Sequence, residues 1–127
     1  ESTLQGKSCA LRRYTMRIDG FVSAHAPFTG GELITKPIRF NGNRLLLNLA
    51  TSVVGSVRVE IQDPQAEPIP GFTLGDSEAI YGDEIARPAT WRGNPDVSAL
   101  AGKAVRLRFE LKDADLYAYQ FKWIQTR

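Results

Sequence analysis

The sequence predicts an all-β fold, an antiparallel β-sandwich with a jelly-roll-like arrangement, in a single domain that spans residues 1–127. Apolar and polar residues alternate with a period of two in several segments, and no segment carries a sustained helical stripe. Turn-forming dipeptides recur between the short candidate strands. Such frequent turns favour a sandwich over a parallel sheet.

Length and composition are those of one ordinary globular domain. The chain has 127 residues, 43% hydrophobic and 24% charged, with a formal net charge of +2. This charge is too small for the basic footprint of a nucleic-acid binder, and no segment is long and apolar enough for membrane insertion. Residues 1–8 are polar and expected to fray. The sequence starts at Glu1, with neither a start methionine nor a signal-peptide pattern. We therefore expect a piece excised from a larger protein, in which the lone Cys9 is a small buried residue.

The N-terminal half contains two strand predictions and one hairpin. Residues 12–18 alternate between apolar side chains and arginine or threonine, which predicts a half-buried strand. Residues 44–50 are apolar at nearly every position, which predicts a central strand covered on both faces. Asn41-Gly42 tolerates the backbone of a tight turn, so a hairpin is expected between residues 38–40 and this strand.

The second half continues the pattern. Residues 57–61 and 105–111 alternate between apolar and charged side chains, which predicts two antiparallel strands with one face in water. Residues 63–95 hold several prolines and turn dipeptides, so irregular backbone at a sheet edge is expected there. Residues 96–100 are expected to form one short helical turn.

Four aromatic residues lie two apart near the C-terminus. Tyr117, Tyr119, Phe121 and Trp123 would share one face of the last strand. We predict that this is the core face, with Trp123 partly exposed; a flat binding platform is the alternative. The positions on the opposite face, which include the obvious solvent-facing side chains, are Leu116, Ala118, Gln120 and Lys122.

Several motifs in a fixed order carry a family resemblance. They are GELITKP (31–37), GSVRVEIQD (55–63), PIPGF (68–72), IYGDEI (80–85), LAGKAVRLRF (100–109) and KDADLY (112–117). From residue 19 onward the chain resembles the C-terminal β-sandwich domain that follows the five-bladed-propeller catalytic domain in bacterial glycoside hydrolases of the invertase and arabinanase clan. The resemblance implies a jelly-roll-like accessory module, similar to many carbohydrate-binding modules, that is secreted and covalently linked to the catalytic domain. It supplies no ligand-contacting motif.

A carbohydrate site needs an exposed aromatic ring beside groups that hydrogen-bond sugar hydroxyls. Tyr81 and Trp91 are the best candidates because both lie in the loop-rich stretch, although either ring could equally cap the core. Their charged neighbours can accept or donate hydrogen bonds. The candidate carbohydrate-binding residues are Tyr81, Trp91, Asp83, Glu84, Arg87, Arg92 and Trp123.

Charged residues are segregated along the chain. Seven acidic residues and no lysine or arginine lie from Glu60 to Ala86, whereas arginines fall on the polar strand faces. One interpretation is a solvated sheet face with cross-strand pairs to Glu60 and Glu110. The other is a surface that attracts an acidic polysaccharide or the partner domain. The arginines are Arg13, Arg17, Arg58, Arg106 and Arg108.

Acidic residues also raise the question of metals. Asp113 with Asp115, or Asp76 with Glu78, could supply the oxygen ligands of a structural calcium ion, although neither spacing is diagnostic. With one histidine and one cysteine in the chain, zinc and redox metals are not expected. No other cofactor is expected.

No catalytic pattern is present in the sequence. Asp83 and Glu84 are neighbours, and neighbours on a strand point to opposite faces, so they would not converge as acid and base. No serine lies in a nucleophile elbow. We predict a non-catalytic carbohydrate-binding module that targets a polysaccharide-degrading enzyme to its glycan. A structural domain that docks on and stabilises the catalytic domain is the alternative, and an enzyme acting on glycans is a third hypothesis.

Overall fold

The chain folds as an all-β structure, as predicted. The computed structural model describes residues 13–16, 21–26 and 30–125. The predictions for residues 1–8, for Cys9 and for Arg17 fall outside this part. A 3₁₀ turn at Ser98–Leu100 is the expected short helical turn. The strands are β1 (Arg13–Met16), β2 (Phe21–Ala26), β3 (Gly31–Thr35), β4 (Ile38–Arg39), β5 (Arg44–Gln62), β6 (Asp83–Pro88) and β7 (Ala104–Lys122).

Two long strands organise the sheet. β5 and β7 pair with each other in antiparallel fashion, β6 flanks β5 and β3 flanks β7, which gives the order β1-β3-β7-β5-β6. β2 and β4 pair with further stretches of β7. The predicted antiparallel sheet is confirmed except at one pair, because β1 runs parallel to β3. The strands predicted at residues 44–50 and 57–61 are two parts of β5.

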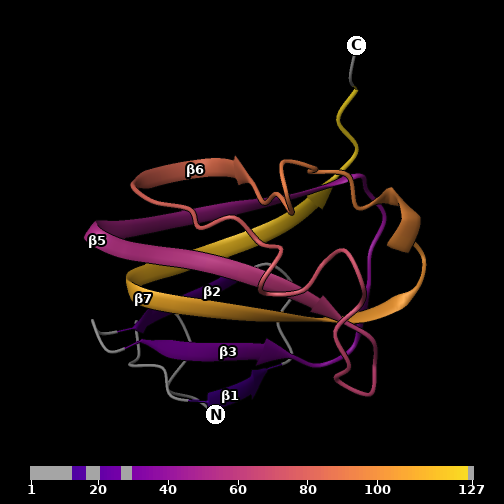
Figure 1. Cartoon of the computed structure of the whole chain (residues 1–127), viewed down its shortest axis with the longest axis horizontal. Coiled ribbons are helices and arrows are strands. Elements are labelled where there is room, and N and C mark those ends of the chain that lie inside the picture. Colours follow the sequence, from indigo (N-terminus) through magenta and orange to yellow (C-terminus); the bar gives the residue numbers. More distant parts are fainter. Residues whose placement is uncertain (1–12, 17–20, 27–29, 126–127) are drawn as a thin grey trace.

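β5 and β7 bend back at the same place. Figure 1 shows each strand running to the left of the view and returning. The register between them shifts there, from the pair Thr51–Ala114 to the pair Ser56–Lys112. Asp113, which the register skips, has a φ of 43°, a conformation that aspartate tolerates better than most residues.

The bend divides the sheet into two parts. We call residues 44–51 and 114–122, with β2 and β6, the β6 half. We call residues 56–62 and 104–112, with β1, β3 and β4, the β3 half. Buried side chains of the two halves form one hydrophobic cluster, so the bend brings them onto a common core.

Alternation places the core side chains as predicted in the β3 half. Val57, Val59 and Ile61 are fully buried, while Arg58 between them is exposed. In the β6 half, every second residue of β5 joins the same cluster. The fully buried members of β5 and β7 in this cluster are Leu45, Leu47, Leu49, Val57, Val59, Ile61, Val105, Leu107, Phe109, Leu111 and Leu116.

The prediction for the last strand is wrong at Tyr117 and Leu116, whereas Tyr119 and Phe121 pack on the core and Trp123 is partly exposed, as expected. Leu116, expected on the solvent side, is fully buried, whereas Tyr117 is 37% exposed and Tyr119 only 5%. Residues 48 and 49 pair with Ala118 and Leu116, so β7 bulges at Tyr117. A bulge changes which face the following side chains occupy, and the four aromatic rings therefore do not share one face.

The predicted hairpin at Asn41-Gly42 is also wrong. Ile38–Arg39 pairs with β7 and not with β5. The ring of Phe40 is buried and stacks on an aromatic ring of β7, which holds this segment against β7. Gly42 serves close packing, because a Cβ there would lie 2.7 Å from the backbone nitrogen of Lys122.

Replacing Gly55 with alanine should destabilise the fold by about 1–3 kcal/mol, since the new Cβ would overpack a rigid backbone contact. That Cβ would lie 2.4 Å from the carbonyl oxygen of Asp113. Denaturant unfolding followed by circular dichroism measures the change. Gly75→Ala is the matched control, because its Cβ would have ordinary contact at 3.8 Å and should change stability little. Equal effects of the two substitutions would contradict the role given to Gly55.

Candidate functional site

Of the three candidate aromatic rings, two are exposed and one is not. Tyr81 is 59% and Trp123 56% exposed, whereas Trp91 is 2% exposed. The indole Nε1 of Trp91 donates to the carbonyl oxygen of Val59 at 2.9 Å, and its ring contacts Phe72 edge-on at 5.2 Å. Trp91 therefore caps the core, and its prediction as an exposed sugar-stacking ring is wrong.

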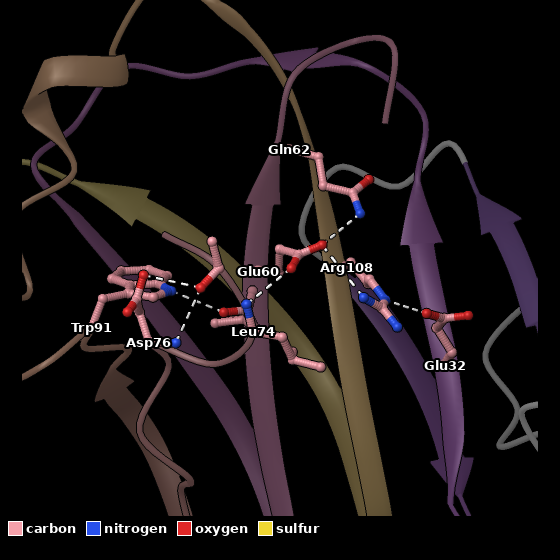
Figure 2. A network of polar contacts seen from close by, with 9 residues as sticks. Glu32, Glu60, Gln62, Leu74, Asp76, Trp91 and Arg108 are labelled. Atoms are coloured by element: carbon pink, nitrogen blue, oxygen red, sulfur yellow. Dashed lines mark hydrogen bonds and ion pairs between the residues drawn. The ribbon is translucent and has the colours of Figure 1, made fainter. Parts of the chain in front are cut away.

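The predicted solvated face of the β3 half contains a buried carboxylate. Glu60 is 3% exposed and accepts hydrogen bonds from Gln62 at 2.7 Å and from the backbone nitrogen of Leu74 at 2.9 Å. Arg108 lies 3.5 Å from it and also pairs with Glu32 (Figure 2). The cross-strand pair predicted for Glu60 is confirmed, but it lies beneath the loop that carries Leu74.

Two arginines of this face, Arg106 and Arg108, are engaged inside the protein. Burial disfavours the charged form of Arg108, but Glu32 and Glu60 outweigh burial and raise its pKa above the ordinary value. Arg106 donates to the backbone carbonyls of Pro64 and Thr35. Neither guanidinium is presented to solvent as an isolated cation, whereas Arg58 on the same face is exposed. The side chains of Arg13 and Arg17 lie outside the described part, so the anion-attracting surface stays a prediction.

Arg92 belongs to a separate ion pair. Its Nε lies 2.6 Å from Asp76, which also accepts a hydrogen bond from the hydroxyl of Thr73 at 2.9 Å. The hydrogen bond from Arg92, then that from Thr73, holds the pKa of Asp76 below its ordinary value. These contacts stabilise the loop before Trp91, and they engage Arg92 with Asp76.

Three of the four calcium candidates have protein partners: Asp76, Glu78 and Asp115. Asp76 pairs with Arg92, and Glu78 accepts from the hydroxyl of Thr90. Within residues 13–16, 21–26 and 30–125, no three histidine, cysteine or acidic side chains gather as a metal site would require. Asp113 and Asp115 lie at and after the bend of β7. The calcium ion stays a prediction.

Tyr81 is positioned by backbone contacts on both sides. Ile80 exchanges hydrogen bonds with Val57 at 2.9 and 3.0 Å, beyond the bend of β5. Gly82 donates to the hydroxyl of Thr51 at 2.8 Å and accepts from its backbone nitrogen at 3.1 Å, before the bend. The exposed ring is thus held beside the bend, between the two halves.

Two carboxylates, those of Asp83 and Asp115, lie near Tyr81 on the two strands that flank β5. In the β6 half, Ala50 pairs with Asp83 on one side and with Asp115 on the other, so the three residues form a row across the strands. The hydroxyl of Tyr117 donates to Asp115, and burial, with the charges of Asp115 and Asp83, raises the pKa of Tyr117. This row and the two tyrosines form what we call the tyrosine-aspartate end: Tyr81, Asp83, Asp115 and Tyr117.

A shallow depression continues from this end along the outer face of the β6 half. Its volume is about 150 Å³. Its walls combine apolar side chains with two amides, Asn48 and Gln120, and Ile85 in it is 84% exposed. At the strand edge Glu84 pairs with Arg87 at 3.7 Å. The depression is lined by Leu46, Asn48, Ile85, Ala118, Tyr119 and Gln120.

The structure therefore brings together only part of the predicted site. Tyr81, Asp83, Glu84 and Arg87 lie on one segment at the bend and on β6, whereas Trp91 is in the core. Trp123 lies after β7, where its Nε1 donates to Asn41 at 3.0 Å. Sequence reasoning missed Asn48 and Gln120, and it placed Tyr117 on the core face with a binding platform as the alternative. The bulge that turns Tyr117 outward leaves no sequence motif that would have indicated it.

Comparison with known proteins gives no relative. No family model, no characterised protein and no solved structure matches the chain. Among the described residues, no helix has the length and apolar character needed to cross a membrane. Function must therefore be argued from the site itself.

Trp91→Phe should lower the free energy of unfolding by about 1–3 kcal/mol, because it leaves a buried carbonyl without its indole donor. Trp123→Phe also removes an indole hydrogen bond, but at a ring that is 56% exposed, and should cost less than about 0.5 kcal/mol. Urea titration of both variants measures the difference. A larger loss for Trp123→Phe would contradict the placement of Trp91 in the core.

Proposed function

We propose that the chain is a non-catalytic module that binds a polysaccharide through the tyrosine-aspartate end. The observation that carries the proposal is the exposed ring of Tyr81, held by its backbone neighbours beside Asp83 and the partly exposed Tyr117. An aromatic face stacks on the apolar face of a sugar, and carboxylates accept hydrogen bonds from its hydroxyls. Tyr81 and Asp83 are predicted site residues, to which Tyr117 and Asp115 are now added.

The proposed architecture is a β-sandwich of jelly-roll type. Its support is the common core of the β6 half and the β3 half and the return of β5 and β7 on themselves (Figure 1). Together with the motifs given above, this supports an accessory domain of a bacterial glycoside hydrolase, secreted and covalently linked to a catalytic propeller. Such a module acts by tethering, since an enzyme held on its substrate meets a higher local concentration of cleavable bonds.

Tyr81→Ala should abolish retention of the isolated domain on its glycan, because the stacking surface is lost while the core is untouched. Binding to an array of neutral and acidic polysaccharides is measured with calcium and again with chelator. Trp123→Ala, which removes an equally exposed ring beyond β7, is the matched control and should keep full retention. Both variants are first checked for an unchanged unfolding midpoint.

Four results would change this proposal. Absence of retention by the folded wild-type domain would overturn it, and loss of binding with Trp123→Ala alone would move the site to the C-terminal end. Loss of binding in chelator would assign an ion to the site. New reducing ends after incubation with the polysaccharides would make the domain an enzyme.

One observation favours the docking alternative. Val53 is 98% and Val54 66% exposed at the bend of β5, and Ile85 is 84% exposed on β6. Apolar side chains that project in this way are typical of surfaces covered by another domain. In that case, removal of the domain should lower the thermal unfolding temperature of the linked catalytic domain, and the isolated domain should retain no glycan. An unchanged unfolding temperature would reject the docking role.

A further inference from the structure

The dipeptide Asn41-Gly42 forms no hairpin, and the proposed function makes no use of it. Asn41 is exposed and lies between β4 and β5, outside every strand. Among the four asparagines of the chain, it alone precedes a glycine. Glycine has no Cβ to hinder its own backbone nitrogen from approaching the side chain of the preceding asparagine. The pair is therefore chemically suited to lose the side-chain amide.

The surroundings of Gly42 leave its backbone nitrogen uncommitted. In the described part of the chain, the amide of Gly42 donates to no acceptor, whereas the amide of Asn43 donates to the carbonyl oxygen of Lys122 at 3.0 Å. The Oδ1 atom of Asn41 accepts a hydrogen bond from the indole of Trp123 at 3.0 Å. Trp123 is 56% exposed, so this contact can open to water without disturbing the core.

The other asparagines are held in place or blocked. The side chain of Asn43 is tied to the backbone of Ile124, through its Nδ2 at 2.9 Å and its Oδ1 at 2.7 Å. Asn48 lies inside β5, where the ladder with β7 fixes its backbone. Asn94 precedes a proline, which has no N–H with which to attack. Exposure, irregular backbone and a following glycine coincide at Asn41.

We propose that Asn41 is a site of spontaneous deamidation. The backbone nitrogen of Gly42 gives up its proton and forms a bond to Cγ of Asn41. The bond from Cγ to the side-chain nitrogen then breaks, and this nitrogen leaves as ammonia with the proton, so that a succinimide ring remains. Water opens the ring at one of two bonds. Cleavage between Cγ and the ring nitrogen gives aspartate, and cleavage at the backbone carbonyl carbon of residue 41 gives isoaspartate.

Isoaspartate would lengthen the main chain by one carbon at a closely packed place. A Cβ on Gly42 would already lie 2.7 Å from the backbone nitrogen of Lys122, so a shift toward β7 cannot take up an added methylene. The next residue, Asn43, holds the backbone of Lys122 and Ile124. Conversion to isoaspartate therefore loosens the end of β7, and either product adds one negative charge.

The experiment incubates the folded protein beside the same chain unfolded in guanidinium chloride, at mildly alkaline pH. Peptide mapping by mass spectrometry follows the replacement of the side-chain nitrogen by oxygen. We expect Asn41 in the folded protein to convert within an order of magnitude of its rate in the unfolded chain, and faster as the pH rises. Asn43 and Asn48 are internal controls that should stay intact in the folded protein. Asn41→Gln should abolish the conversion, since the longer side chain closes the ring poorly.

A second measurement separates the two products. Asn41→Asp carries the new charge without the longer main chain and should keep the unfolding midpoint of the wild type. The isoaspartyl form is purified by chromatography and identified with an isoaspartate-specific methyltransferase. It should unfold at a lower denaturant concentration and exchange the amide hydrogens of Asn43 and Ile124 faster.

Two results would overturn the deamidation site. One is an intact Asn41 in the folded protein after the unfolded chain has converted, because the fold would then protect the side chain. The other is equal conversion in Asn41→Gln. If the isoaspartyl form and Asn41→Asp unfold at the same midpoint, the loosening of the end of β7 is rejected.

Discussion

The rest of the structure depends on the paired bend of β5 and β7. Two 19-residue strands stay hydrogen-bonded to each other while both reverse direction, and this is sterically allowed only because Gly55 has no side chain to meet the backbone of Asp113. The bend turns one long ribbon into two halves whose apolar faces bury each other. It also creates the surface at which Tyr81 is held, since the backbone contacts of Ile80 and Gly82 lie on opposite sides of it.

The polar side chains divide the molecule into a neutralised face and an acidic end. On the β3 half, Arg108 lies between Glu32 and Glu60, and the buried carboxylate of Glu60 fixes the backbone of Leu74 (Figure 2). A buried carboxylate requires such partners, because leaving it unpaired would cost several kcal/mol. Arg106 and Arg108 are thus committed to the fold. At the bend, in contrast, the carboxylate of Asp83 is exposed, and Asp115 accepts a hydrogen bond from the hydroxyl of Tyr117.

Bulges decide which side chains reach the candidate site. A strict alternation along β7 would bury Tyr117 and expose Leu116. Because the register with β5 skips Tyr117, Leu116 is buried and Tyr117 is partly exposed. β6 has a comparable register shift between its pairs with Leu47 and Leu49, beside the exposed Ile85. One extra residue in a strand is therefore enough to convert a regular sheet face into a depression bordered by a tyrosine.

The sequence by itself determined the all-β class, the core positions of residues 57–61 and 105–111, and the turn at residues 96–100. It also determined most of the irregular stretch at residues 63–95, although β6 lies inside that stretch and was not predicted. Each of these follows from local periodicity or from the backbone preferences of proline, which act within a few residues. Half of the candidate site, Tyr81 with Asp83, could be predicted because both residues lie in the stretch that prolines and turn dipeptides mark as loop-rich. Only the tertiary structure decided that Trp91 is a core residue, that Gly42 and Gly55 serve close packing, and that Tyr117 joins Asp83 at the surface. These outcomes depend on contacts between segments distant in the chain, which alternation along one strand does not encode.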